Sequence, residues 1–285
     1  MKRRLLLITL ICIMIVQAVS IMPAKADNGS SFTILLLGVD SAGETVDEAG
    51  NSDAVVIASM GLESGLFKMV NLQRDTLVEL PDGLGAARLC TATSHGGPLV
   101  ALKTVNSLLT LDISYYVLVD MAGMEKIINT LNGLELDVAT NDLGILLPDG
   151  KTKLFEKAGP QTLNTQQVMA YMNSPVVLDG SNRSARLTKI LIACLNKALT
   201  LDLGNLLDFA SEFLNYVETN MTLNDMMNVA FAALSVKLEG IETLQFPQVS
   251  KAETRENKSV VIIDNLPEEV SAVHRFLLEA APVQP

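Results

Sequence analysis

A nearly continuous apolar run near the start of the chain, Phe32-Thr-Ile-Leu-Leu-Leu-Gly38-Val-Asp40, ends on an acid. Such a run is typical of a strand that is buried on both faces of a sheet. After a polar loop, Asp53-Ala-Val-Val-Ile-Ala-Ser-Met60 predicts a second strand, and Lys68-Met-Val-Asn-Leu-Gln73 predicts a third that runs into Arg74-Asp75. Because open α/β sheets bind ligands at strand ends, we expect Asp40, Asp53, Arg74 and Asp75 to form a functional site there.

The rest of the chain alternates predicted strands with predicted helices. Further strands are expected at 115–120, 134–138, 243–246 and 259–264. Helices are expected at about 98–109, 121–131, 165–172, 183–199, 202–218, 222–236 and 268–280. Residues 139–160 are interpreted as a loop, and the charged segment 251–258 as a solvated connection. This order predicts an α/β sandwich with a mixed sheet. No linker divides residues 27–285, so we expect a single domain with a frayed carboxyl-terminal tail.

Residues 1–26 have the composition of an export signal. A basic start, Lys2-Arg3-Arg4, precedes an apolar segment, and Ala24-Lys25-Ala26 matches a small-x-small cleavage pattern. The segment from Leu5 to Met22 is also long enough for an uncleaved membrane anchor. Both alternatives place the rest of the chain outside the cytoplasm.

The exported part is strongly acidic. The whole chain has a formal net charge of −11, and residues 1–26 hold Lys2, Arg3, Arg4 and Lys25 but no acid before Asp27, so the remainder is more negative still. Nucleic-acid binding needs a basic face, and we therefore exclude nucleic acid as a partner. An anionic ligand would need a local arginine cluster or a cation.

Two cysteines, Cys90 and Cys194, lie in the exported part, which is too few for a disulfide framework. They can form one bridge or remain separate buried thiols, and we favour separate thiols. The hydrophobic fraction of 49% with only 4% aromatic residues predicts an aliphatic core of ample size.

Oxygen ligands and arginines carry the chemistry that the sequence offers. No glycine-rich phosphate loop, HExxH zinc motif or GxSxG elbow is present, and the two histidines, His95 and His274, lack ligand spacing. Asp40 and Asp53 flank one loop and can converge on Mg²⁺, which accepts one or two carboxylates alongside phosphate oxygens. The alternative is that two loop acids simply cap turns.

Four arginines fit a clamp on a diphosphate. Arg183 and Arg186 are three residues apart at the start of a predicted helix, so they share one face. They can form a solvated first turn, but the macrodipole disfavours cations there, which favours a bound anion. Together with Arg74 and Arg88, they would hold oxyanions while a carboxylate, Asp75, acts as a base.

Several segments together resemble the LytR-CpsA-Psr family of cell-wall glycopolymer transferases, over nearly the whole exported part. The segments that carry the resemblance are Leu35-Leu-Leu-Gly38-Val-Asp40-Ser41, Ser52-Asp53, Arg74-Asp75-Thr76, Gly96-Gly97-Pro98, Tyr115-Tyr116-Val117, Leu131-Asn-Gly133-Leu-Glu-Leu-Asp-Val138, Leu163-Asn-Thr-Gln-Gln-Val-Met-Ala-Tyr171 and Arg183-Ser-Ala-Arg186. The resemblance implies an exported α/β/α sandwich. It also implies transfer of a glycopolymer from an undecaprenyl (polyprenyl) pyrophosphate carrier at the membrane surface to a peptidoglycan hydroxyl, as a phosphodiester.

The same resemblance implies roles for individual residues. Asp40 and Asp53 match the family's metal-binding aspartates, and Arg74 and Asp75 match its arginine-aspartate pair. Arg183 and Arg186 match the arginines that open a helix and bind pyrophosphate. Arg88 stands where the family usually has lysine.

The chain departs from the family pattern where further arginines are usual. It has Ala42, Asn51, Asn173 and Pro175 at those positions, and Leu187 where glutamine is usual. Each lost charged contact is worth roughly 1.5 to 3 kcal/mol. We therefore keep two hypotheses: a Mg²⁺-assisted phosphotransferase, and a non-catalytic binder of polyprenyl phosphates or wall glycans.

The lipid carrier adds a structural expectation. A clamp of arginines can hold the diphosphate of a long isoprenoid only if the tail has an apolar place to lie. We therefore predict an elongated apolar cavity that opens within reach of Arg183 and Asp40. An ordinary close-packed core would contradict the lipid-carrier hypothesis.

Overall fold

The computed structural model describes residues 31–39, 50–61, 66–147, 149–174, 183–235, 240–255 and 258–278. The predicted signal or anchor at 1–26, the predicted tail after 280 and the predicted metal ligand Asp40 lie outside these ranges. Within them, no helix combines the length and apolarity needed to cross a membrane.

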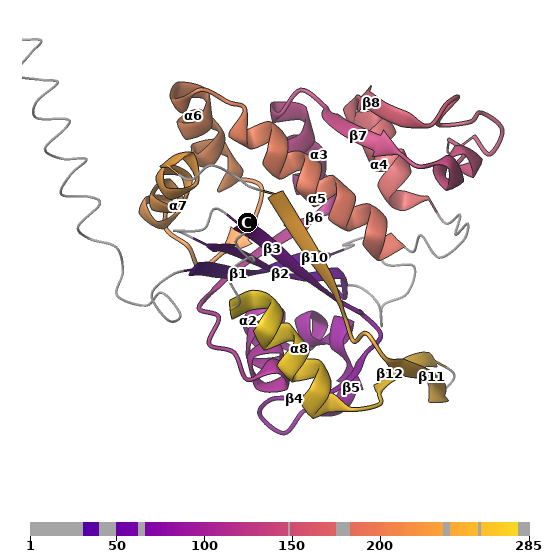
Figure 1. Cartoon of the computed structure of the whole chain (residues 1–285), viewed down its shortest axis with the longest axis vertical. Helices are drawn as coiled ribbons and strands as arrows, with labels where there is room; N and C mark the ends of the chain where they lie inside the picture. Colours follow the sequence, from indigo (N-terminus) through magenta and orange to yellow (C-terminus); the bar gives the residue numbers. More distant parts are fainter. Residues whose placement is uncertain are drawn as a thin grey trace, which may run out of the picture.

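A six-stranded sheet with the strand order β10-β3-β2-β1-β6-β9 forms the centre of the molecule (Figure 1). Its strands are β1 (Ser31–Val39), β2 (Ser52–Gly61), β3 (Leu66–Leu72), β6 (Tyr115–Asp120), β9 (Glu218–Thr219) and β10 (Gly240–Phe246). β2 is antiparallel to both β1 and β3, whereas β6 runs parallel to β1 and β10 runs parallel to β3. The predicted mixed sheet is confirmed.

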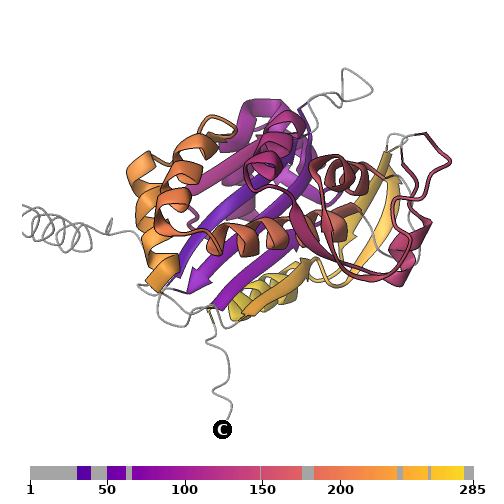
Figure 2. The ribbon, with the colours of Figure 1, turned by 90° about the horizontal axis from the view of Figure 1, so that it is seen from above.

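Helices cover both faces of this sheet (Figures 1 and 2). One face carries α2 (Ala92–Leu109) and α8 (Leu266–Leu278). The other carries α3 (Met121–Thr130), α4 (Thr165–Asn173), α5 (Arg183–Leu199), α6 (Leu203–Phe213) and α7 (Leu223–Ser235). The α/β/α sandwich is confirmed. Asn164 and Gln167 form a reciprocal capping box at the start of α4.

Three two-stranded sheets lie outside the central one, and sequence patterns did not show all of their strands. They pair β4 (Leu77–Leu80) with β5 (Gly85–Arg88), β7 (Leu134–Val138) with β8 (Gly159–Leu163), and β11 (Ser250–Arg255) with β12 (Lys258–Ile263). The expectation of a solvated connection at 251–258 is wrong. β11 is exposed along its whole length, so it lacks the alternation of apolar residues that identifies most strands.

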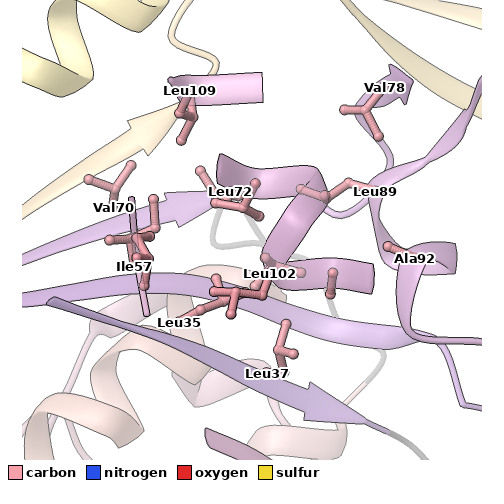
Figure 3. Close-up of a cluster of buried hydrophobic side chains, with 14 of the residues drawn as sticks. Leu35, Leu37, Ile57, Val70, Leu72, Val78, Leu89, Ala92, Leu102 and Leu109 are labelled. Atoms are coloured by element: carbon pink, nitrogen blue, oxygen red, sulfur yellow. The ribbon is translucent and has the colours of Figure 1, made fainter. Parts of the chain in front are cut away.

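The core on the α2 side of the sheet is aliphatic (Figure 3). Leu35 and Leu37 of β1 pack there with Ile57 of β2 and Leu102 of α2, and each of the four is less than 10% exposed. Leu36, which lies between Leu35 and Leu37, belongs to an apolar cluster on the other face of the sheet. Successive side chains of β1 therefore point to opposite faces, as expected for a strand.

Helix α2 bends just before Pro98. Gly96 and Gly97 have non-helical backbone angles, and Gly97 has a φ of 71°, in the left-handed region that favours glycine. Pro98 starts the straight part of the helix, as expected for a proline in a first turn. Thr93 and Ser94, which precede the bend, contact Gly50 and Asn51 at the start of β2.

Candidate functional site

The register of the sheet brings five strand ends to one edge. Val39 at the carboxyl end of β1 lies opposite Ser52 at the amino end of β2 and opposite Asp120 at the carboxyl end of β6. Leu72, the last residue of β3, lies opposite Phe246 of β10. The residues that immediately follow β3 and those that open β2 therefore share this edge, which we call the strand-end edge.

Four of the predicted site residues meet at the strand-end edge. The Nη1 atom of Arg74 donates to Oδ1 of Asp53, and its Nε lies 3.6 Å from Oδ1 of Asp75. The Nη1 atom of Arg88 donates to the same oxygen of Asp75 at 3.1 Å. The predicted gathering of carboxylates and arginines is confirmed for these residues, which we call the Arg74 cluster (Asp53, Arg74, Asp75 and Arg88).

Backbone hydrogen bonds hold the loop that carries Arg74 and Asp75. The Cys90 N–H donates to the Arg74 carbonyl, and the Val261 N–H donates to the Asp75 carbonyl, each at 2.8 Å. Thr76 accepts from the Leu89 N–H at 2.8 Å. The β11–β12 hairpin is thus anchored directly to the loop of the Arg74 cluster, a contact that the sequence did not reveal.

The Arg74 cluster is partly shielded from solvent. The side chains of Asp53 and Arg88 are 13% and 12% exposed, whereas those of Arg74 and Asp75 are 32% and 37% exposed. The Nη2 atom of Arg88 is buried and has no hydrogen-bond partner among the described residues. A buried donor without a partner leaves the cost of its desolvation uncompensated.

Arg186 lies in a buried polar network. Its side chain is 1% exposed, donates from Nη2 to the Ser174 carbonyl, and lies 6.0 Å from the ring centroid of Tyr171. The reading of Arg186 as part of a solvated first turn is therefore excluded. Its predicted role in pyrophosphate binding stays a prediction. Arg183 begins α5, but its side chain lies outside the described part of the structure.

The network continues to Asp142, which sequence reasoning missed. Tyr171 donates to Oδ2 of Asp142 at 3.0 Å, and the Nζ of Lys189 lies 3.4 Å from the same oxygen. Burial, together with the adjacent Asp142 carboxylate, raises the pKa of Tyr171. These contacts join α4 to the first turns of α5. Nothing in the sequence indicated a role for Asp142, because its segment has no regular spacing of apolar residues. Tyr171, which lies in a predicted helix, was the only member of this contact that the sequence singled out.

An apolar cavity opens next to the Arg74 cluster, on the opposite face of the sheet from the core in Figure 3. It contains about 860 Å³ of empty space, including open solvent at its mouth. Side chains of β1, β2, β6, α3, α4, α5 and α6 form its wall, and the charged residues among them are Asp53 and Asp120. An apolar cavity is therefore present, and its charged residues lie at the strand-end edge. The predicted opening at Arg183 and Asp40 stays a prediction, because those side chains lie outside the described part of the structure.

Cys90 and Cys194 are separate thiols. Neither forms a disulfide, and Cys194 lines the apolar cavity while Cys90 is buried. Burial raises the pKa of Cys194 to about 12. Burial also raises the pKa of Cys90, against the lowering effect of nearby Arg74 and Arg88. Both thiols are therefore protonated at neutral pH.

The described residues contain no group of three or more His, Cys, Asp or Glu side chains suited to a metal ion. Asp53 fits a Mg²⁺ site as a carboxylate at the strand-end edge, and the other predicted ligand, Asp40, lies outside the described residues. Since Arg74 contacts Oδ1 of Asp53, its guanidinium supplies positive charge where a cation would lie. The donor set is that of a hard cation bound by few protein ligands.

A family model described as the LytR_cpsA_psr family matches residues 15–271. This chain belongs to that family. It is 28% identical over 220 residues to the "Polyisoprenyl-teichoic acid--peptidoglycan teichoic acid transferase TagT" of Bacillus subtilis, which covers 75% of this chain and 67% of that protein. It is 27% identical over 209 residues to the corresponding transferase TagU of Enterococcus faecalis, which covers 72% of this chain and just under two thirds, 66%, of that protein.

The fold matches a solved member of the family. The structure described as "LytR-CPS2A-psr family protein YwtF (TagT) with bound octaprenyl pyrophosphate lipid" superposes with a TM-score of 0.68 at 22% identity. The match covers 90% of this chain and 94% of that one. At this identity the likeness establishes the fold.

Two residues that depart from the LytR_cpsA_psr pattern have clear structural positions. Asn51 is 4% exposed and accepts from the Ser94 hydroxyl at 2.9 Å, so it joins β2 to α2. Leu187 lines the apolar cavity. A polar residue at position 187 would place a donor or acceptor in this wall, whereas leucine makes the wall more apolar.

Proposed function

We propose that this protein is an exported, Mg²⁺-assisted phosphotransferase that moves a glycopolymer from a polyprenyl pyrophosphate carrier to a peptidoglycan hydroxyl. The observation that carries the proposal is the junction at Asp53, which belongs to the Arg74 cluster and also lines the apolar cavity. A ligand with a charged head and a long apolar tail would occupy both. Family membership and the named activities of its relatives support the same function.

The apolar cavity suits the isoprenoid tail. Its wall is almost wholly apolar, and a relative of the same fold is described with bound octaprenyl pyrophosphate. Burial of an isoprenoid contributes roughly 25 cal/mol for each Å² of apolar surface removed from water. In this proposal, the tail lies between the sheet and α5, and the diphosphate lies at the strand-end edge.

The arginines of the cluster would hold the diphosphate. Arg74 and Arg88 already contact carboxylates from one side, and the buried Nη2 of Arg88 lacks a partner among the described atoms. Guanidinium groups bind phosphate oxygens through paired hydrogen bonds. Arg183 and Arg186 complete the proposed clamp from the start of α5.

Asp75 is the proposed general base. Its side chain is the most exposed of the Arg74 cluster, so an acceptor hydroxyl can reach it. Asp75 would take the proton of this hydroxyl as its oxygen attacks the phosphorus that carries the glycopolymer. A new oxygen–phosphorus bond then forms, the bond to the bridging oxygen breaks, and polyprenyl phosphate leaves. Arg74 orients Asp75 and stabilises the charge.

Asp40 and Asp53 are the proposed ligands of Mg²⁺. A bound cation would supply charge neutralisation of the diphosphate oxygens. The residues of the chain then perform the other tasks: Arg74 and Arg88 orient the phosphates, Asp75 accepts the proton, and the apolar wall excludes water.

The proposed location is the outer face of the cytoplasmic membrane or the exterior. Residues 1–26 have the pattern of a signal or an anchor. An uncleaved anchor would hold the protein at the membrane surface, where a lipid-linked substrate lies, and a cleaved form would be released into the same compartment. Peptidoglycan, the proposed acceptor, lies in the same compartment.

The proposal is tested by incubating the purified protein with Mg²⁺, a polyprenyl-diphosphate-linked saccharide and peptidoglycan. We expect release of polyprenyl phosphate together with attachment of the saccharide to peptidoglycan. A family member with the full set of arginines serves as the positive control. An inert protein beside an active control would show that the transferase proposal is wrong.

Substitution of the usual arginines favours a second candidate, a protein that binds polyprenyl phosphates or wall glycans without turnover. Asn51 is buried and engaged with Ser94, and Asn173 is exposed without a positive charge. This candidate predicts ligand binding that survives Asp40→Ala and Asp53→Ala. Metal-dependent turnover that disappears in both variants would decide for the transferase.

A further inference from the structure

A second cleft lies beside the apolar cavity at the strand-end edge. It contains about 810 Å³ of empty space, open solvent included. Its wall is formed by the ends of β1 and β6, the first turns of α3 and residues 215–218. The polar side chains on this wall belong to Asp120, Lys126, Asn215, Tyr216 and Glu218. We call it the polar cleft.

The polar cleft is a built feature of the fold. Asp120 caps α3 by accepting from the Gly123 N–H at 2.7 Å. A Cβ atom at Gly123 would lie 2.2 Å from the Tyr216 carbonyl oxygen, so only glycine allows α3 to approach this segment so closely. The Nζ of Lys126 lies 5.5 Å from the centroid of the Tyr216 ring, which holds both side chains at the wall.

The polar cleft is continuous with the proposed reaction site. Val39 and Asp120 line both the polar cleft and the apolar cavity, and Asp53 lines the cavity at the same edge. In the sheet, β6 lies next to β1, and β1 lies next to β2, which carries Asp53. Val39, which lines the polar cleft, lies opposite Ser52 in the sheet, and Ser52 directly precedes Asp53 of the Arg74 cluster.

The lining of the polar cleft suits a neutral sugar. It offers carboxylates, an amide, an ammonium group and a tyrosine, which are donors and acceptors for hydroxyl groups. Two acids, Asp120 and Glu218, outnumber the one base, Lys126, so a chain of phosphates would be repelled. The apolar cavity, in contrast, offers few polar groups along its wall.

We propose that the polar cleft binds the glycan of the acceptor and directs its hydroxyl towards the Arg74 cluster. This inference rests on the proposed function, because it names where one of the two substrates of that reaction lies. The lipid tail occupies the apolar cavity, the diphosphate lies at the cluster, and the acceptor glycan approaches from the β6 side. The two substrates therefore meet at the end of β1.

The test compares two tryptophan substitutions on exposed positions of α3. Ala122 lines the polar cleft, so Ala122→Trp fills it, whereas Glu125→Trp places the same side chain on the same helix outside the cleft. Binding of soluble, neutral oligosaccharides of β-1,4-linked N-acetylglucosamine, the uncharged sugar of the peptidoglycan glycan, to the full-length protein is measured by calorimetry. We expect about tenfold weaker binding for Ala122→Trp. Glu125→Trp should bind as the wild type does.

Two further measurements separate this proposal from the proposed function. Binding of polyprenyl diphosphate should be the same in both variants and the wild type, because neither substitution reaches the apolar cavity or the Arg74 cluster. Asn215→Ala, which removes one exposed amide from the cleft, should weaken glycan binding by about threefold. Thermal unfolding verifies that each variant is folded.

The proposal is overturned if the wild type binds no glycan or if Ala122→Trp binds glycan normally. It is also overturned if Ala122→Trp weakens the binding of polyprenyl diphosphate instead, because the cleft would then serve the donor. Each of these results can occur while the transferase assay succeeds. Loss of glycan binding in Ala122→Trp, with normal diphosphate binding, supports the proposal even if turnover is absent.

Discussion

Arg74 joins two carboxylates that reach it from different elements: its Nη1 contacts Asp53 on β2, and its Nε lies 3.6 Å from Asp75 in its own loop. Asp53 and Arg74 are 21 positions apart in the sequence. The guanidinium of Arg74 therefore links Asp53, which lines the apolar cavity, to Asp75, the proposed base. Loss of Arg74 should affect both.

Arg74→Ala is expected to lower transfer activity by about 10- to 100-fold. A charge-assisted hydrogen bond contributes roughly 1.5 to 3 kcal/mol, and 1.4 kcal/mol corresponds to a factor of ten. The measurement is kcat/KM for release of polyprenyl phosphate. Arg255→Ala is the matched control, since Arg255 is exposed on β11 and pairs with Glu253. Equal activity in the two variants would contradict the role of Arg74.

Mg²⁺ should be required, and Asp53 should set its affinity. We expect excess chelator to stop transfer and Asp53→Asn to raise the Mg²⁺ concentration for half-maximal activity by about tenfold. Asp137→Asn, at an exposed acid on β7, should leave this concentration unchanged. Transfer that continues at full rate in chelator would show that the metal assignment is wrong.

Leu191→Trp should narrow the apolar cavity, because Leu191 forms part of its wall on α5. Binding of a long polyprenyl diphosphate is expected to weaken about tenfold or more, whereas a diphosphate with one or two isoprene units should bind nearly as before. Leu99→Trp provides the control, since Leu99 is 54% exposed on α2. If the long and short ligands lose affinity equally, the tail does not lie in this cavity.

Tyr171→Phe should destabilise the protein by about 1 to 3 kcal/mol, because buried Asp142 loses a hydrogen-bond donor. Tyr115→Phe is the control, because Tyr115 is half-buried. Substitutions near the surface that leave no buried group without a partner usually change the free energy of unfolding by no more than about 0.5 kcal/mol. The free energy of unfolding is measured by urea denaturation. A change below that of the control would show that the Asp142–Tyr171 contact adds no stability.

The same variant has a distinct pH dependence. Burial and the nearby Asp142 carboxylate raise the pKa of Tyr171 in the folded protein above the ordinary tyrosine value of about 10. Above about pH 10 the unfolded chain therefore ionises while the folded tyrosine stays neutral, so the wild type loses stability as pH rises. The difference between wild type and Tyr171→Phe should narrow there. A constant difference across this range would contradict the raised pKa.

Local patterns were sufficient to locate many elements. The predicted bounds of β6 at 115–120, β7 at 134–138 and α5 at 183–199 agree with the structure. Alternation, apolar periodicity and turn residues act over a few positions, so they are visible in the sequence alone. The charged strand β11 was missed because its stability comes from pairing with β12 rather than from an apolar face.

The candidate site divides in the same way. Sequence placed Asp53, Arg74 and Asp75 at strand ends, and the antiparallel and parallel pairing of the central strands brings these ends to one edge. The helix macrodipole suggested that Arg186, near the start of a predicted helix, binds an anion. This argument does not show which residues pack against Arg186. Tyr171 and the Ser174 carbonyl cover Arg186, and both come from another element.

The sequence by itself therefore determined which chemical groups stand at the ends of strands, since strand boundaries depend on local apolar patterns and the carboxylates adjoin them. The tertiary structure alone decided which groups touch. Arg74 pairs with Asp53, Arg88 shares Asp75, and Val261 anchors the Asp75 carbonyl. These contacts join distant segments, and the apolar cavity and the polar cleft likewise exist only where strands and helices from across the chain pack together.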